Sequence, residues 1–158
     1  MQDESKKSQF RVDREARDIL VRNLQSLLAG TITNDEFENH LKRSDDPAVT
    51  AILRNGAWTL YDDLFEHKLT DHRWTTSHNQ KEFIDRCILF LGCNLEYEWP
   101  VMNGPWEFMW LILTMATFGL AGKLRWRAIM KLSGGDQSVW PFFRPEDLAH
   151  VLRSRPPG

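Results

Sequence analysis

Asp63 and His67 have the spacing in this chain that comes closest to a chemical motif. They lie four residues apart, so on a helix they would share one face and could supply two ligands to one metal ion. Asp62 or Glu66 would then orient the pair. A metal site needs a third or fourth ligand, and nothing in the sequence fixes one. We therefore predict no metal site and interpret the region as a solvated acid–histidine pair near a helix end.

The other residue types that carry catalysis form no recognisable set. Cys87 and Cys93 are six residues apart, which matches neither a Cys-x-x-Cys motif nor a zinc ligand set. Cys87 lies on the apolar stripe of its predicted helix and is interpreted as a small core residue. No nucleophile elbow, phosphate-binding loop or His-Glu-x-x-His motif occurs in the sequence. We predict no catalytic residue and no cofactor, and expect a protein that is not an enzyme.

A basic cluster follows the most apolar stretch of the chain and is the first candidate binding set. It consists of Lys123, Arg125, Trp126, Arg127 and Lys131. Each positive charge near an anionic lipid surface is worth about 1 kcal/mol, so the cluster could contact lipid. It could instead contact phosphate, with the Trp126 indole stacked on a base. The simpler interpretation is the C-terminal region of a helix, where cations complement the helix dipole.

The second candidate set is aromatic and consists of Tyr97, Trp99, Trp140 and Phe142. Trp99 and Trp140 each precede a proline, which disfavours helical geometry at the preceding residue, so both are expected on extended segments. Core packing of the two tryptophans on each other is the favoured interpretation. If they were exposed, the four side chains would form an interaction patch, because aromatic residues dominate binding hot spots.

Residues 106–122 form an apolar segment with one charge, at Glu107. A helix that is hydrophobic all round is buried either in a protein core or in lipid. A helix of this length reaches about 25 Å at about 1.5 Å per residue, which is short of the roughly 30 Å hydrocarbon core. We favour a buried central helix. A membrane span and a helix lying in the membrane interface are the alternatives.

Helices are predicted to position these groups. Apolar residues follow helical spacing over Val12–Ala29, and Gly30 sits where a terminating glycine is expected. Capping patterns at Thr33–Glu36, Asp46–Pro47 and Ser77–Gln80 predict three more helix starts. Each of these patterns is local, so each predicts a boundary without reference to the rest of the chain.

The end of the chain continues the helical pattern. Ser133-Gly134-Gly135-Asp136 is typical of a helix end and turn, and Pro145-Glu146-Asp147 opens a last helix. No sustained alternation of apolar and polar residues occurs. We predict a mainly α protein, a compact bundle of five to seven helices, with at most short extended segments near 97–101 and 138–143.

Charge divides the chain into two parts. The 158 residues carry a net charge of −2, which argues against a dedicated nucleic-acid-binding protein. Lysine and arginine number 13 against 18 aspartate and glutamate up to Glu98, but 7 against 4 from Trp99 onward. We predict a single domain over 11–154, with an acidic part 11–98 and an aromatic, basic part 99–154. Residues 1–10 and 155–158 are expected to be disordered.

Two stretches carry a resemblance to bacterial sequences. The run Leu28-Ala29-Gly30-Thr31-Ile32-Thr33-Asn34-Asp35-Glu36-Phe37-Glu38 resembles the signature of short C-terminal helical hairpin domains. Together with Tyr97-Glu98-Trp99-Pro100 and Val139-Trp140-Pro141-Phe142, it makes the chain resemble an uncharacterised bacterial family of small helical proteins. The resemblance implies a bacterial protein and brings no activity and no functional residues with it.

The sequence therefore favours a non-enzymatic protein that binds another macromolecule, with a protein as the expected partner. The alternative is a membrane-associated protein anchored by 106–122 and the basic cluster at 123–131. The first residues, Met1–Lys7, contain no apolar stretch, so no secretory signal is expected. A cytoplasmic location is predicted, with the cytoplasmic membrane as the alternative.

Overall fold

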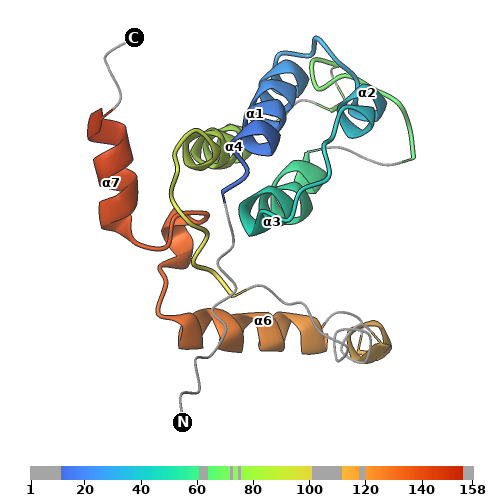
Figure 1. Ribbon diagram of the computed structural model, residues 1–158. Helices are drawn as coiled ribbons and strands as arrows, with labels where there is room; N and C mark the ends of the chain where they lie inside the picture. Colours follow the sequence, from blue (N-terminus) through green and yellow to red (C-terminus); the bar gives the residue numbers. More distant parts are fainter. Residues whose placement is uncertain are drawn as a thin grey trace. The chain divides into compact units, whose positions relative to one another are not determined.

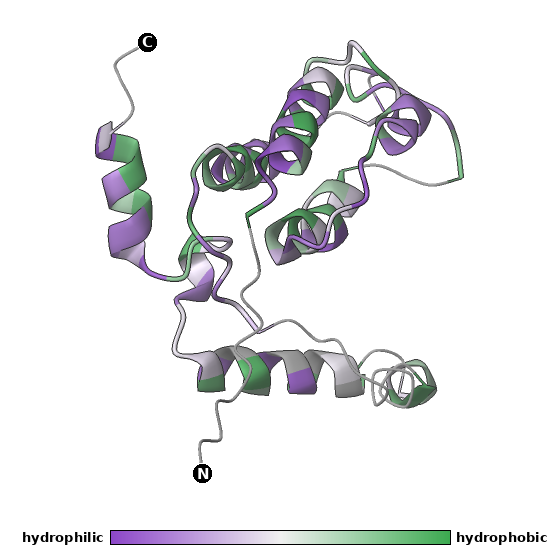
Figure 2. Ribbon diagram, in the orientation of Figure 1, coloured by the Kyte–Doolittle hydropathy of each residue, from purple (hydrophilic) through white to green (hydrophobic). Residues whose placement is uncertain are grey.

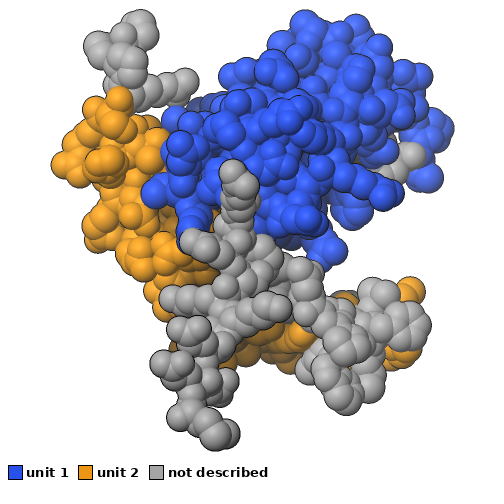
Figure 3. All heavy atoms as spheres, viewed as in Figure 1, with its two compact units in different colours: residues 1–96 blue, residues 97–158 orange. Residues whose placement is uncertain are grey.

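The computed structural model describes residues 12–60, 64–71, 73–74, 76–100, 112–117 and 120–154. The chain divides into two compact units, residues 1–96 and 97–158, shown in different colours in Figure 3. The division lies close to the change in charge at Trp99. The prediction of a single domain over 11–154 stays a prediction, and each unit is described by itself. The segments expected to be disordered, 1–10 and 155–158, lie outside the described residues.

Unit 1 contains four α-helices and one 3-10 turn within its described residues. These are α1 (Arg14–Leu28), α2 (Asn34–Asn39), α3 (Pro47–Asn55), η1 (Ala57–Thr59) and α4 (His78–Leu91). α1 contacts α2, α3 and α4, and α3 also contacts α4 and η1 (Figure 1). The side chains that fill the core between them include Leu20, Leu24, Leu27, Phe37, Ile52, Ile84 and Leu91.

The predicted helix boundaries in unit 1 are confirmed by their capping interactions. The Thr33 side chain accepts a hydrogen bond from the backbone N–H of Glu36, and the Glu36 side chain accepts one from the backbone of Thr33. Ser77 and Gln80 form the same reciprocal cap at the start of α4. Gly30 follows α1 with φ +66°, a left-handed conformation that favours glycine.

A buried ion pair joins three helices of unit 1. Arg17 of α1 is fully buried, with its Nε 2.6 Å from Oδ2 of Asp46 and its Nη2 3.2 Å from Oδ1. Its Nη1 donates to the backbone carbonyls of Cys93 at 3.0 Å and Leu95 at 2.9 Å, just beyond the end of α4. The guanidinium group also lies 5.4 Å from the centre of the Phe90 ring. Four of the five N–H donors of this arginine are therefore used inside the unit.

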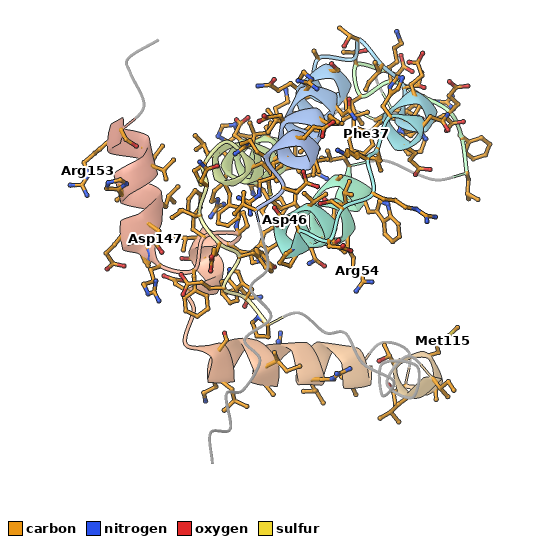
Figure 4. The ribbon with its side chains drawn as sticks, viewed as in Figure 1. Phe37, Asp46, Arg54, Met115, Asp147 and Arg153 are labelled. Atoms are coloured by element: carbon orange, nitrogen blue, oxygen red, sulfur yellow. The ribbon has the colours of Figure 1, made fainter. Side chains whose placement is uncertain are left out.

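Asp46 is the predicted N-cap of α3, and the structure confirms that role. Its Oδ1 accepts from the backbone N–H of Ala48 at 2.9 Å, and its Oδ2 accepts from the backbone N–H of Asp13 at 3.1 Å. Pro47 occupies the first turn, where its missing N–H costs no hydrogen bond. One carboxylate thus caps α3, binds the backbone N–H of the residue that precedes α1 and neutralises the charge of Arg17. Figure 4 shows Asp46 at the start of α3.

Unit 2 is also helical. Its described residues form a short helix at 112–116, α6 (Leu120–Ser133), a 3-10 turn η2 (Gln137–Val139) and α7 (Pro145–Ser154). The described part of the chain as a whole contains seven α-helices and no strand, so the predicted mainly α fold with five to seven helices is confirmed. Residues 138–143, expected to be extended, begin instead with η2. Gly134 follows the last residue of α6 and has φ +78°, the left-handed conformation that is typical of a glycine at the predicted helix end.

Candidate functional site

His67 is not the solvated residue that the sequence suggested. Residues 64–68 are not helical, so the shared helix face proposed for positions 63 and 67 is wrong; residues 62, 63 and 72 lie outside the described residues. The imidazole is buried and stacks on Trp74 with ring centres 4.0 Å apart. Its Nδ1 lies 2.7 Å from the carbonyl oxygen of Phe65, which can only accept, so Nδ1 carries the proton. The backbone N–H of His67 donates a hydrogen bond to the side-chain oxygen of Asn34 at 2.8 Å, which fixes the same loop against α2.

The two cysteines have different surroundings. Burial raises the pKa of the Cys87 thiol to about 12, so it stays protonated at neutral pH. Its place in the core of α4 confirms the interpretation from sequence. Cys93 is half-buried, and its thiol donates to the carbonyl of Phe90 at 2.9 Å. Across the described residues, no group of three histidine, cysteine or acidic side chains could hold a metal ion.

The aromatic candidate set lies mostly inside unit 2. Trp99 and Phe142 are buried, and the Trp99 indole donates to the carbonyls of Pro141 at 3.0 Å and Phe142 at 3.2 Å. Trp140 is also buried, and its indole lies 3.2 Å from the hydroxyl of Tyr97, which is half-buried. Of the two interpretations of these aromatics, burial favours core packing over an exposed patch.

The same aromatic core explains the geometry around the two Trp-Pro pairs. Trp140 has φ −47° and ψ 136°, so the proline after it holds it out of a helix as expected. Trp99 packs edge-to-face on Phe143, with ring centres 5.2 Å apart. Arg144 lies 5.2 Å from the same Phe143 ring and pairs with both carboxylate oxygens of Glu98, at 3.0 and 2.9 Å. These contacts tie residues 97–100 to 135–144 within unit 2.

The apolar segment 106–122 is not one continuous helix. Residues 101–111 and 118–119 lie outside the described residues; between them a helix covers 112–116, and α6 begins at Leu120. A side chain at Gly122 would come within 2.7 Å of the Thr114 methyl group, so α6 lies close against the preceding helix. None of the helices in the described ranges has the length and hydropathy needed to cross a membrane.

The large apolar side chains described in this segment are exposed, which differs from the expected buried core helix. Ile112 is 53% exposed, and Met115, which projects from its helix in Figure 4, is 72% exposed. Figure 2 shows this short helix as hydrophobic and α6 as a mixture of hydrophobic and hydrophilic residues. Large exposed apolar side chains that follow one another in this way are unusual on a protein surface that contacts only water.

The outward side of α6 combines leucines with cations, and we call it the α6 face. At about 100° per residue its members span an arc of about 140° around the helix. Leu120, Leu124 and Leu132 are 61%, 58% and 86% exposed. In projection Lys131 lies between Leu120 and Leu124, and Arg127 lies at the edge of the arc beside Leu120. The half-buried side chains of α6, those of Arg125, Ile129 and Ser133, project outside this arc. The α6 face consists of Leu120, Leu124, Arg127, Ala128, Lys131 and Leu132.

The basic cluster lies along α6, with Lys131 in the last turn, where the simplest interpretation from sequence expects a cation, and the other members earlier in the helix. Lys123 and Lys131 are eight residues apart, and α6 extends on both sides of them. Arg127 and Lys131 are exposed, Arg125 is half-buried, and the side chains of Lys123 and Trp126 fall outside what the structure describes. Residues 108–135 contain no aspartate or glutamate in the sequence. Within this stretch of sequence every charged residue is therefore positive.

Comparisons with protein-family models, curated proteins and solved structures found no match to this chain. The resemblance to a bacterial helical family stays a prediction. Two features were missed by the sequence reasoning: the Arg17–Asp46 pair and the outward leucines of α6. The signal for the second was present, since Leu120, Leu124 and Leu132 repeat at multiples of four residues and their neighbours are basic.

Proposed function

We propose that this chain is a non-enzymatic interaction protein whose docking surface is the α6 face, and that it docks on the anionic surface of a membrane. The observation that carries the proposal is the exposure of Leu120, Leu124 and Leu132 among cations on one side of α6. A surface helix of a water-soluble domain normally turns its leucines inward. Here they point outward, where a lipid interface would cover them.

The charge of the surface supports lipid as the occupant. Arg127 lies beside the leucines at the edge of the face, Lys131 lies among them, and the sequence from 108 to 135 offers no carboxylate that would repel phospholipid headgroups. An interfacial helix likewise combines leucines with lysine or arginine, whose long side chains carry their charge to the headgroups. The cytoplasmic leaflet is the anionic side of a cell membrane, so we place the protein on that side.

The expected energy is sufficient for reversible docking. Fully burying one leucine is worth about 1.5–3 kcal/mol, so three partly exposed leucines contribute roughly 3–6 kcal/mol. Arg127 and Lys131 add about 1 kcal/mol each near an anionic surface. The sum must also offset the cost of immobilising the protein. It is typical of a peripheral protein and falls short of permanent insertion.

Flotation of the full chain with lipid vesicles tests the proposal. Vesicles of phosphatidylcholine mixed with phosphatidylglycerol should carry the protein to the top of a density gradient, and vesicles of phosphatidylcholine alone should carry much less. The double variant Arg127→Glu/Lys131→Glu should reduce flotation at low salt. Leu124→Ser/Leu132→Ser should reduce it at every salt concentration, because it removes the apolar contribution.

Arg153→Glu is the matched control, since Arg153 is exposed on α7 of the same unit and is not part of the α6 face. It should float like the unchanged protein. The proposal fails if the unchanged protein does not float with either vesicle. In that case a protein partner with an acidic, apolar groove becomes the better candidate for the same surface, because helices of this type also dock in such grooves.

A further inference from the structure

A cavity of about 500 Å³ opens on the surface of unit 1, and all the residues that line it belong to that unit. Its floor is one side of α3, its first wall is the segment 41–45 that leads into α3, and its second wall is Trp58 of η1. The volume lies within the range of about 300–1,000 Å³ that is typical of sites for small molecules. The proposed membrane docking makes no use of it.

Trp58 gives the cavity an unpartnered aromatic wall. Its side chain is 59% exposed, whereas Trp99 and Trp140 are buried. The floor beside it is apolar, because Val49 and Leu53 line it from the same side of α3. Val49 is almost fully buried and Leu53 is half-buried. A flat ring placed there would stack on the indole and cover the floor, a geometry that aromatic pairs favour.

The cations at the rim divide into those that are engaged and those that are not. The ammonium group of Lys42 pairs with Glu15 at 2.5 Å, and that carboxylate raises the pKa of Lys42. Arg43 and Arg54 also line the cavity and are exposed, and they have no ion-pair partner in the described part of the chain. Figure 4 shows Arg54 projecting from α3. Among the described residues, nothing pairs with these two guanidinium groups, so both can bind an anion.

The charge at the rim selects the kind of anion. Asp45 lines the same cavity and is exposed, so the rim carries one carboxylate beside the guanidinium groups of Arg43 and Arg54. The Ser44 hydroxyl offers no further donor, because it donates to Asp13 at 2.9 Å. A net charge of about one positive unit suits a single negative charge better than a doubly charged phosphate group. A carboxylate also matches the planar fork of an arginine.

We propose that this cavity binds a small aromatic carboxylate, with its ring stacked on Trp58 and its acid group held by Arg43 and Arg54. The site needs no contribution from unit 2. It is therefore independent of the proposed membrane docking, and either proposal can fail without the other.

Titration of the full chain with naphthalene-2-carboxylate, followed by NMR, tests the site. The indole N–H signal of Trp58 is assigned by its loss in the variant Trp58→Phe. That signal should shift and saturate as the probe is added. In Arg43→Gln/Arg54→Gln the dissociation constant should rise about five- to tenfold, as expected for the loss of exposed guanidinium–carboxylate contacts. Arg22→Gln, at an exposed arginine of α1 outside the cavity, should bind as tightly as the unchanged chain.

Two matched probes separate the ring from the charge. Naphthalene-2-methanol has the ring without the charge, and acetate has the charge without the ring. Both should bind much more weakly than naphthalene-2-carboxylate. The proposal is overturned if the Trp58 signal does not respond, if the alcohol binds as tightly as the carboxylate, or if the double arginine variant binds as tightly as the unchanged chain.

Discussion

Replacing Arg17 with methionine would leave the Asp46 carboxylate buried without its cation. Methionine fills much of the volume of the arginine stem, so the main loss is electrostatic. The variant removes two hydrogen bonds to Asp46, at 2.6 and 3.2 Å, and two more to the carbonyls of Cys93 and Leu95. Breaking a buried pair from one side costs about 3–5 kcal/mol. Domains are stable by only about 5–15 kcal/mol, so a substantial part of the stability of unit 1 would be lost.

The assay is urea unfolding of the full chain, followed by circular dichroism and by hydrogen exchange of the amides in α1 and α4. Exchange is needed because two compact units need not unfold in one transition. Arg22→Met is the control; this exposed arginine of the same helix should change the free energy of unfolding by no more than about 0.5 kcal/mol.

A second variant separates the ion pair from general damage to the helix. Arg17→Met/Asp46→Asn removes both charges and keeps a residue that caps helices nearly as well as aspartate. It should be more stable than Arg17→Met alone, since no unpaired charge is left in the core. The reasoning is refuted if Arg17→Met costs less than about 1 kcal/mol, or if the double variant is the less stable of the two.

Three further outcomes follow from the described contacts. Asp13 caps α1, and hydrogen bonds from the backbone N–H of Ala16 and the hydroxyl of Ser44 lower the pKa of its carboxyl group. The cap therefore stabilises the fold above the unfolded pKa of about 4, and this stabilisation is lost as pH falls through the lower folded pKa. Asp13→Asn should flatten the acid limb of a stability–pH profile. Iodoacetamide at pH 8 should modify Cys93 and leave the core thiol intact in folded protein, as peptide mass mapping would reveal. Gly135→Ala places a methyl group 2.8 Å from the Trp99 ring and should cost about 1–3 kcal/mol, with a changed near-ultraviolet circular dichroism spectrum.

Local signals in the sequence predicted the helix boundaries, because the groups that terminate a helix lie within a few residues of one another. The reciprocal caps at Thr33 and Ser77 are examples. Asp46 shows where such reasoning ends. Its role as a cap is local and was predicted, but its partner Arg17 lies 29 residues earlier and is brought to it only by the packing of α1 against α3.

The course of α6 could not be predicted for a similar reason. The sequence predicts one buried helix over 106–122, and Gly122, the last residue of that segment, weakens a helix in isolation. In the folded unit the missing side chain leaves room for Thr114 of the preceding helix, and α6 continues to Ser133. The basic cluster consequently lies along a helix and beside exposed leucines. The cavity beside Trp58 could not be predicted either, because only the packing of the segment 41–45, α3 and η1 brings Arg43 and Arg54 to the same rim.

Fractionation of cells that express the full chain tests the central claim most directly. Membranes are collected without detergent, then washed with high salt and afterwards at alkaline pH. Docking through the α6 face predicts protein in the membrane pellet at low salt, partial release by high salt and complete release at alkaline pH. Protein that stays in the supernatant at low salt would contradict docking on membranes. Protein that survives both washes would contradict a peripheral contact and indicate insertion.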